Sequence, residues 1–171
     1  MSLVDKISSE DRERILRKNW WSHDGRWFLF TAREVGFEVA NKLNMLVNKS
    51  MGKAEMKRLL AALNMDETTA ADNFFEIIET VSDLYCKDVF VIDGFTKERD
   101  DRWVFRIKDA PCYQGTKKAG IIDSYQCACW KRFEGWVEAC GLKADVSIRK
   151  SLVKGDDECE IVVSIEKRDS Q

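Results

Sequence analysis

One ten-residue segment, from Asn19 to Phe28, concentrates side chains that could carry out chemistry. It holds three of the six tryptophans, the only histidine, an acid, a base and a glycine. His23 is the first candidate for a general base, because imidazole is the side chain whose ordinary pKa lies near neutrality. Asp24 follows it directly, and both belong to the predicted catalytic set. The alternative is a helix junction wrapped in aromatic rings, with His23 as a capping residue.

The same region offers side chains that could bind a ligand. Trp21 and Trp27 could form the walls of a pocket, and Arg26 could hold a carboxylate through two parallel hydrogen bonds. Farther along, Asn41 and Asn44 lie three residues apart on an expected helix. Asparagine forms helices weakly, so a file of amides on one helix face is unusual. We predict that Asn41 and Asn44 face a cavity and bind a small polar molecule.

Cys127 is the cysteine best placed for nucleophilic chemistry. If Asp123 or Ser124 caps a helix, Cys127 lies in its first turn, where free amides and the helix dipole favour a thiolate. Such a thiolate is a nucleophile or a metal ligand. Two side chains two residues apart on a helix diverge by about 200°. Cys127 and Cys129 are therefore not expected to share an ion.

The remaining cysteines suggest packing rather than chemistry. Cys129 and Cys140 lie about three helical turns apart and are predicted to be buried thiols. Common zinc-site spacings are absent, so no metal and no other cofactor is predicted. Convergence of Cys112 and His23 with Cys127 on a metal ion is the alternative. Without an export signal, the six cysteines are expected to be reduced, in the cytoplasm.

Composition limits the classes of partner. The 171 residues suit a single domain over 1–171, and 28 basic against 30 acidic residues leave a net charge of −2. The charges are interspersed, which argues against a nucleic-acid partner and against a polybasic membrane patch. No apolar run approaches the roughly 20 residues of a membrane-spanning helix. The expected partner is a small-molecule ligand, with a homodimer as a further candidate.

The first half of the sequence has helical periodicity. A short amphipathic helix is expected from Ser8 to Trp20, and Ser22 is expected to cap a longer helix that runs to about Lys49. Gly36 interrupts that helix and is expected to admit another backbone at close range. Further helices are predicted over Lys53 to Leu63 and after Thr68 or Thr69. The apolar stripe of the long helix consists of Phe28, Ala32, Val35, Val39, Leu43 and Leu46.

The second half changes to the alternation of strands. The predicted order is two strands, a loop over 109–122, a helix from Tyr125 to Cys140 ended by Gly141, and two more strands. The strands are expected over Asp88–Phe95, Arg102–Lys108, Ala144–Val153 and Glu158–Lys167. The fold class is therefore α+β. A helical N-terminal half of four to five helices packs on an antiparallel sheet of about four strands in two hairpins, with one helix inserted between the hairpins.

Short motifs resemble those of a known group of proteins. The run from Trp21 to Phe28, then Gly36, Ala40 and Asn44, is similar to an uncharacterised prokaryotic family. That family is related to L-2-amino-thiazoline-4-carboxylic acid hydrolase-like proteins. The helix from Cys127 through Trp136 to Gly141, followed by a hairpin, fits the same outline. The resemblance implies a helical layer on an antiparallel sheet and a ring-opening amidine or amide hydrolase, without supplying catalytic residues.

Three functions follow from these observations. The first is binding of a small polar or carboxylate-bearing molecule in an aromatic-lined pocket. The second is hydrolysis of a C–N bond, in which Cys127 or a water activated by His23 attacks a polarised carbon. The third is a homodimeric assembly module that buries the tryptophans between two copies. Whether the protein is an enzyme is left open by the sequence.

Overall fold

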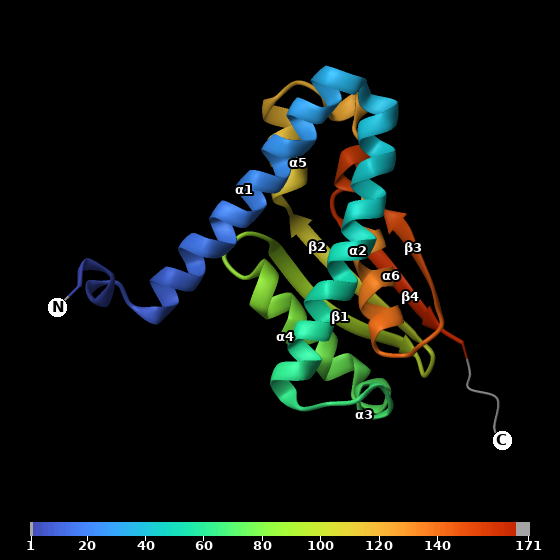
Figure 1. The fold of residues 1–171 in the computed structure, drawn as a ribbon. Helices are drawn as coiled ribbons and strands as arrows, with labels where there is room; N and C mark the ends of the chain where they lie inside the picture. The colour runs from blue at the N-terminus through green and yellow to red at the C-terminus, as the bar shows by residue number, and fades with distance from the viewer. Residues whose placement is uncertain (1, 167–171) are drawn as a thin grey trace.

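The computed structural model describes residues 2–166 and confirms the predicted α+β class. Helices dominate the N-terminal half, and four antiparallel strands form one sheet (Figure 1). Within these residues, no helix combines the length and the apolar content that a membrane-spanning helix needs. In chain order the elements are α1 (Ser9–Val35), α2 (Phe37–Leu63), α3 (Glu67–Asp72), α4 (Phe74–Cys86), β1 (Val91–Arg99), β2 (Arg102–Asp109), α5 (Pro111–Lys118), α6 (Cys129–Ala139), β3 (Ala144–Lys150) and β4 (Cys159–Ile165).

Helices α1 and α2 form a long hairpin, and the N-terminal part of α1 projects from the body (Figure 1). The predicted helix start at Ser22 is wrong, because α1 passes through it without a break. The chain turns at Gly36, whose φ of +84° is open mainly to glycine. A Cβ at Gly36 would meet nothing within 4 Å, so the glycine serves this turn and not a close approach of backbones.

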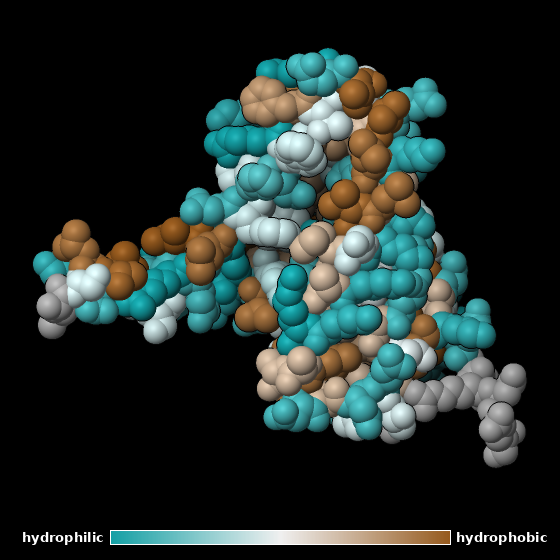
Figure 2. Space-filling view, in the orientation of Figure 1, coloured by the Kyte–Doolittle hydropathy of each residue, from teal (hydrophilic) through white to brown (hydrophobic). Residues whose placement is uncertain are grey.

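The turn at Gly36 divides the predicted apolar stripe between two helices. Several of its members are consequently exposed rather than buried. Figure 2 shows apolar side chains gathered over the part of α2 that follows the turn, and others along the projecting start of α1. On α2 these exposed residues are Val39, Leu43, Leu46 and Val47.

Helices α2 and α6 cross in backbone contact, which the sequence analysis did not predict. A Cβ at Gly52 would lie 3.0 Å from the carbonyl carbon of Arg132 and closer still to its oxygen. A Cβ at Gly135 would lie 2.7 Å from the amide nitrogen of Lys53. Two glycines that face each other therefore set the distance between these helices.

The sheet has the order β1-β2-β4-β3, so the last strand lies at its centre. Its strand pairs confirm both predicted hairpins, and the expected end of the last strand at Lys167 lies outside the described residues. The core fills the space between one sheet face and the helices. Its buried residues include Met56, Ile78, Phe105, Trp136 and Ile161.

The other sheet face is charged, and its central carboxylates are buried beneath cations. Glu160 pairs with Arg106 at 3.4 Å and with Arg149, while Glu158 pairs with Lys108 at 2.7 Å and Lys150 at 3.0 Å. Hydrogen bonds from Lys108 and Lys150 lower the pKa of Glu158 to about 2. In β4 the side chains of Cys159, Ile161, Val163 and Ile165 therefore lie on the core face, and Glu160 lies on the other face with Val162 and Ser164.

Two helices, α5 and α6, lie between the hairpins. The predicted loop over 109–122 contains α5, which begins with Pro111 at its first position, where a missing N–H costs nothing. Helix α6 begins at Cys129, later than predicted. The predicted end at Gly141 is confirmed: its φ is +67°, and the Leu142 amide donates to the Val137 carbonyl at 3.2 Å, as in a Schellman motif.

Candidate metal site at three cysteines

Three cysteine thiols converge at one point between α5 and α6. The Sγ atoms of Cys112, Cys127 and Cys129 all lie within 4.8 Å of one another, and those of Cys112 and Cys129 are 3.7 Å apart. All three side chains are partly buried, and all six cysteines are free thiols. In residues 2–166 this is the one group of three or more cysteine, histidine or acidic side chains that could hold a metal ion.

The local backbone explains why these thiols meet. Cys112 is the second residue of α5, and Cys129 is the first residue of α6. Cys127 precedes α6 in a non-helical link that follows a short 3₁₀ turn over Ile122–Ser124. The expectation that Cys127 and Cys129 diverge is therefore wrong, because it assumed that both residues lie on the same helix.

Asn41 of α2 fixes the link that carries Cys127. Its side-chain Nδ2 donates to the Ser124 carbonyl at 2.9 Å, and its Oδ1 accepts from the Gln126 amide at 2.9 Å. Asn41 is 3 % exposed, so these bonds are made away from water. The Asn41 side chain thus binds the backbone on both sides of Tyr125, the residue two positions before Cys127.

That residue, Tyr125, is held from two further directions. Its ring meets Phe28 of α1 edge-on, with the centroids 5.0 Å apart. Asn44 hydrogen-bonds its side chain, and Asn48 donates to the Asn44 side chain at 2.9 Å. The predicted file of amides therefore faces inward, as expected. It positions the segment before Cys127, and the binding of a small polar molecule by Asn41 and Asn44 stays a prediction.

The three thiols influence one another's ionisation. Hydrogen bonds from Cys112 and Cys129 lower the pKa of Cys127 well below its ordinary value, and the backbone amide of Cys129 adds to this effect. The hydrogen bond to Cys127 raises the pKa of Cys112, and the bonds to Cys112 and Cys127 raise that of Cys129. Cys127 is therefore the thiol of the three whose pKa these contacts lower, and its neighbours rather than a helix start provide most of that effect.

The thiols form one wall of a small hollow. Its other walls are hydrocarbon, apart from Tyr113 and a fourth cysteine, Cys159, and its free volume is about 10 Å³. Cys159 accepts a hydrogen bond from the Leu152 amide at 3.3 Å, and burial raises its pKa to about 11. The hydrocarbon part of the lining consists of Ile107, Ala110, Ile148, Leu152, Val153 and Ile161.

Two predicted site residues belong to a separate buried cluster around Arg132. The Arg132 guanidinium lies 4.5 Å over the ring of Trp21, whose indole N–H donates to the Tyr85 carbonyl at 2.8 Å. Arg132 also pairs with the fully buried Glu55 at 3.4 Å. Burial raises the pKa of Asp24, against the opposing charge of Arg132. This cluster fastens α1 to the body, so Trp21 packs rather than roofs a cavity.

The other predicted residues of α1 face outward. His23 and Arg26 are exposed, and Trp27 is 66 % exposed. His23 precedes Phe28 by five residues, about 140° around the helix, so it points away from the side that contacts Tyr125. The structure therefore does not bring His23 together with Cys127.

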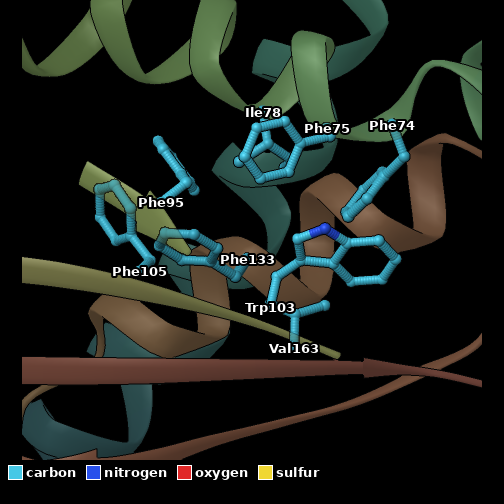
Figure 3. A pocket seen from close by; sticks show the side chains of 8 residues that line it. All are labelled: Phe74, Phe75, Ile78, Phe95, Trp103, Phe105, Phe133 and Val163. Atoms are coloured by element: carbon cyan, nitrogen blue, oxygen red, sulfur yellow. The ribbon is translucent and has the colours of Figure 1, made fainter. Parts of the chain in front are cut away.

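The aromatic-lined hollow of this protein lies elsewhere, between α4 and the sheet. Figure 3 shows phenylalanine rings and Trp103 gathered around this hollow. Its free volume is about 10 Å³. Sequence reasoning missed it, because its rings come from four elements and share no local motif. The lining consists of Phe74, Phe75, Ile78, Phe95, Trp103, Phe105, Phe133 and Val163.

Comparison with solved structures shows that this fold occurs in other proteins. A trafficking protein particle complex subunit 3 from Naegleria fowleri, covalently bound to palmitic acid, matches with a TM-score of 0.65 and 11% identity. The match covers 92% of this chain and 99% of that one. An H-NOX domain from Shewanella oneidensis in the Fe(II)CO state matches with a TM-score of 0.47 and 16% identity, covering 82% of this chain and 75% of that one. At such identities the first match shows a shared fold.

The family is shown by the sequence itself. Residues 6–152 match the family of unknown function DUF6125, and the chain belongs to that family. No curated protein matches the chain. The resemblance to L-2-amino-thiazoline-4-carboxylic acid hydrolase-like proteins stays a prediction, as do the small-molecule and hydrolase functions.

Proposed function

We propose that the protein binds a thiophilic metal ion through Cys112, Cys127 and Cys129. The observation that carries this proposal is the convergence of three thiols from two helices and the link between them. With a metal–sulfur bond of about 2.3 Å, two ligands of a tetrahedral ion lie about 3.8 Å apart. The 3.7 Å between the Cys112 and Cys129 sulfurs matches that edge.

Packing alone is the competing explanation, since free cysteine is often a buried apolar residue. Cys86 and Cys140 fit that explanation, because each is buried and lies outside the cluster. The three clustered thiols differ in two ways. They face one another, and the segment that carries Cys127 is fixed by Asn41 through two buried hydrogen bonds. Support of this kind from outside the ligand set is typical of metal sites.

Three protein ligands leave one position of a tetrahedral ion free. Such sites keep that position for a water or an exogenous ligand, whereas purely structural zinc sites fill all four. The hollow that the three thiols line has a free volume of about one water molecule, which is the room that a fourth ligand of that size would need. The hollow is far too small for an acyl chain, so we do not extend the palmitate of the trafficking subunit to this protein.

The test is metal titration of the reduced, metal-free protein. Co²⁺ should bind with one equivalent, give sulfur-to-cobalt charge-transfer absorption, and be displaced by Zn²⁺. A reductant is needed, because the 3.7 Å pair could otherwise oxidise to a disulfide. Replacing Cys112, Cys127 or Cys129 by Ser should each weaken zinc binding at least about 100-fold.

Cys86→Ala is the matched control, because it removes a buried thiol outside the cluster and should leave zinc affinity unchanged. Circular dichroism of each variant separates loss of the site from loss of the fold. The proposal is wrong if the folded, reduced parent binds no Co²⁺ or Zn²⁺. It is equally wrong if the three serine variants bind zinc as tightly as the parent.

A further inference from the structure

We propose that the three-cysteine site takes a trivalent metalloid, with arsenous acid as the probe ligand. The inference rests on the proposed metal site and names the class of ion that its surroundings favour. Two properties of the site support it: the lining of the hollow carries no charge, and within residues 2–166 no fourth cysteine, histidine or acidic side chain joins the group of three thiols.

Charge is the first argument. None of the eleven residues that line the hollow is a lysine, an arginine or an acid. Tyr113 and Cys159 line it as well, and Tyr125 lies beside the thiols, but none of these can supply a positive charge. Three thiolates around a divalent ion carry a net charge of −1, which is costly in apolar surroundings. Around As³⁺ the same three thiolates sum to zero.

Coordination is the second argument. Zinc would need a fourth ligand, and a water molecule in that place needs two to four polar partners. Apart from Tyr113 and Cys159, the lining that the thiols do not provide is hydrocarbon, from residues such as Ile107, Leu152 and Ile161. Trivalent arsenic is complete with three sulfur ligands and a lone pair, so it would need no fourth donor from this lining. The apolar wall suits a lone pair better than a bound water.

The reaction balances without an oxidant or a reductant. Arsenous acid, As(OH)₃, exchanges its three hydroxides for three sulfurs. Each protonated thiol gives its proton to a departing hydroxide, and a thiol that is already ionised leaves its hydroxide to take a proton from solvent, so three As–S bonds form, three As–O bonds break and three water molecules leave. No net proton is released. Zinc instead displaces the thiol protons into solution, so its affinity rises by about tenfold per pH unit for each proton lost.

The experiment compares arsenite and zinc on the reduced full chain. Arsenite should bind with one equivalent, which is read by intact mass and by ultraviolet As–S absorption, and all three thiols should become unreactive to a thiol reagent. Between about pH 6 and about pH 8 its affinity should not rise, while that of zinc rises at least tenfold. Cys112→Ser should weaken arsenite binding at least tenfold, and Cys86→Ala should leave it unchanged.

The outcomes separate the two proposals. If zinc binds to the three cysteines and arsenite does not, the metalloid inference is wrong and the metal site stands. If arsenite protects two thiols instead of three, or binds Cys112→Ser as tightly as the parent, the inference is also wrong. If the folded protein binds neither ion, both proposals fail together.

Discussion

Replacing Gly52 by Ala tests whether the α2–α6 crossing sets the stability of the fold. A methyl group there would lie 3.0 Å from the carbonyl carbon of Arg132 and closer still to its oxygen. Carbon atoms pack favourably at about 3.5–4.0 Å. The opposing atoms belong to a helix backbone and cannot rotate away, so the two helices must separate by about 1 Å.

The cost follows from that separation. Over-packing a core costs about 1–3 kcal/mol, and a backbone obstacle places Gly52→Ala near the upper end. For a chain of this size, a loss of about 3 kcal/mol lowers the melting temperature by about 6–12 °C. Gly135→Ala should behave alike. The double variant should cost less than the sum, because one separation relieves both clashes.

Gly25→Ala is the matched control, since Gly25 lies within α1 and a Cβ there meets nothing within 4 Å. It should stabilise the protein by about 0.5–1 kcal/mol through helix propensity. Urea unfolding and thermal melts followed by circular dichroism measure all variants. A Gly52→Ala protein within about 0.5 kcal/mol of the parent would refute the proposed backbone contact.

Three further predictions concern polar side chains. Asn41→Ala leaves the Gln126 amide without its partner and should lower the unfolding free energy by about 1–3 kcal/mol, as measured by urea unfolding. The same change should weaken zinc binding about 10–100-fold, as measured by metal titration. Arg132→Met leaves the buried Glu55 without its cation and should cost about 3–5 kcal/mol at neutral pH. That loss, measured by urea unfolding, should shrink on acidification, because burial already raises the pKa of Glu55 and a protonated carboxyl needs no cation. The depressed pKa of Glu158 predicts that the parent loses stability as pH falls from about 4.5 to about 2, and thermal melts should show Glu158→Gln losing less over that window.

Each of these predictions has a contrary result. Unchanged zinc affinity in a folded Asn41→Ala protein would mean that the amide does not position the site. An Arg132→Met loss that grows on acidification would contradict the assignment of Glu55 as its partner. Parallel acid-stability curves for Glu158→Gln and the parent would show that the carboxylate is not stabilised by its lysines.

The fold was largely predictable, because the spacing of the hydrophobic residues distinguishes helices from strands. The strands, the end of α6 at Gly141 and the inward-facing amides were all visible as local patterns. The break at Gly36 was misread, since a glycine within a periodic run signals either a close contact or a turn. The contact glycines, Gly52 and Gly135, look like any other glycine until their partners are known. Their role depends on tertiary packing.

The site was only half predictable, for a related reason. Cys127 was singled out as the reactive thiol, and Cys112 was named beside it in the alternative metal site, but with His23 in the place that Cys129 takes. Cys112 is fifteen residues away, in a stretch that looked like a loop, and the position of Cys129 depended on where α6 begins. Because the predicted start of α6 was wrong by a few residues, thiols that converge in the structure were expected to diverge. Helix boundaries are the least certain part of any sequence-based assignment.

The place of β4 has a consequence for how the polypeptide is made. This strand joins β2 to β3, yet it is synthesised after every other element. Until β4 leaves the ribosome, the edge of β2 that pairs with it has no partner strand. The phenylalanines that pack under this part of the sheet stay exposed to solvent. Released chains truncated before residue 159 should therefore engage chaperones, and only those that include residues 159–165 should resist protease.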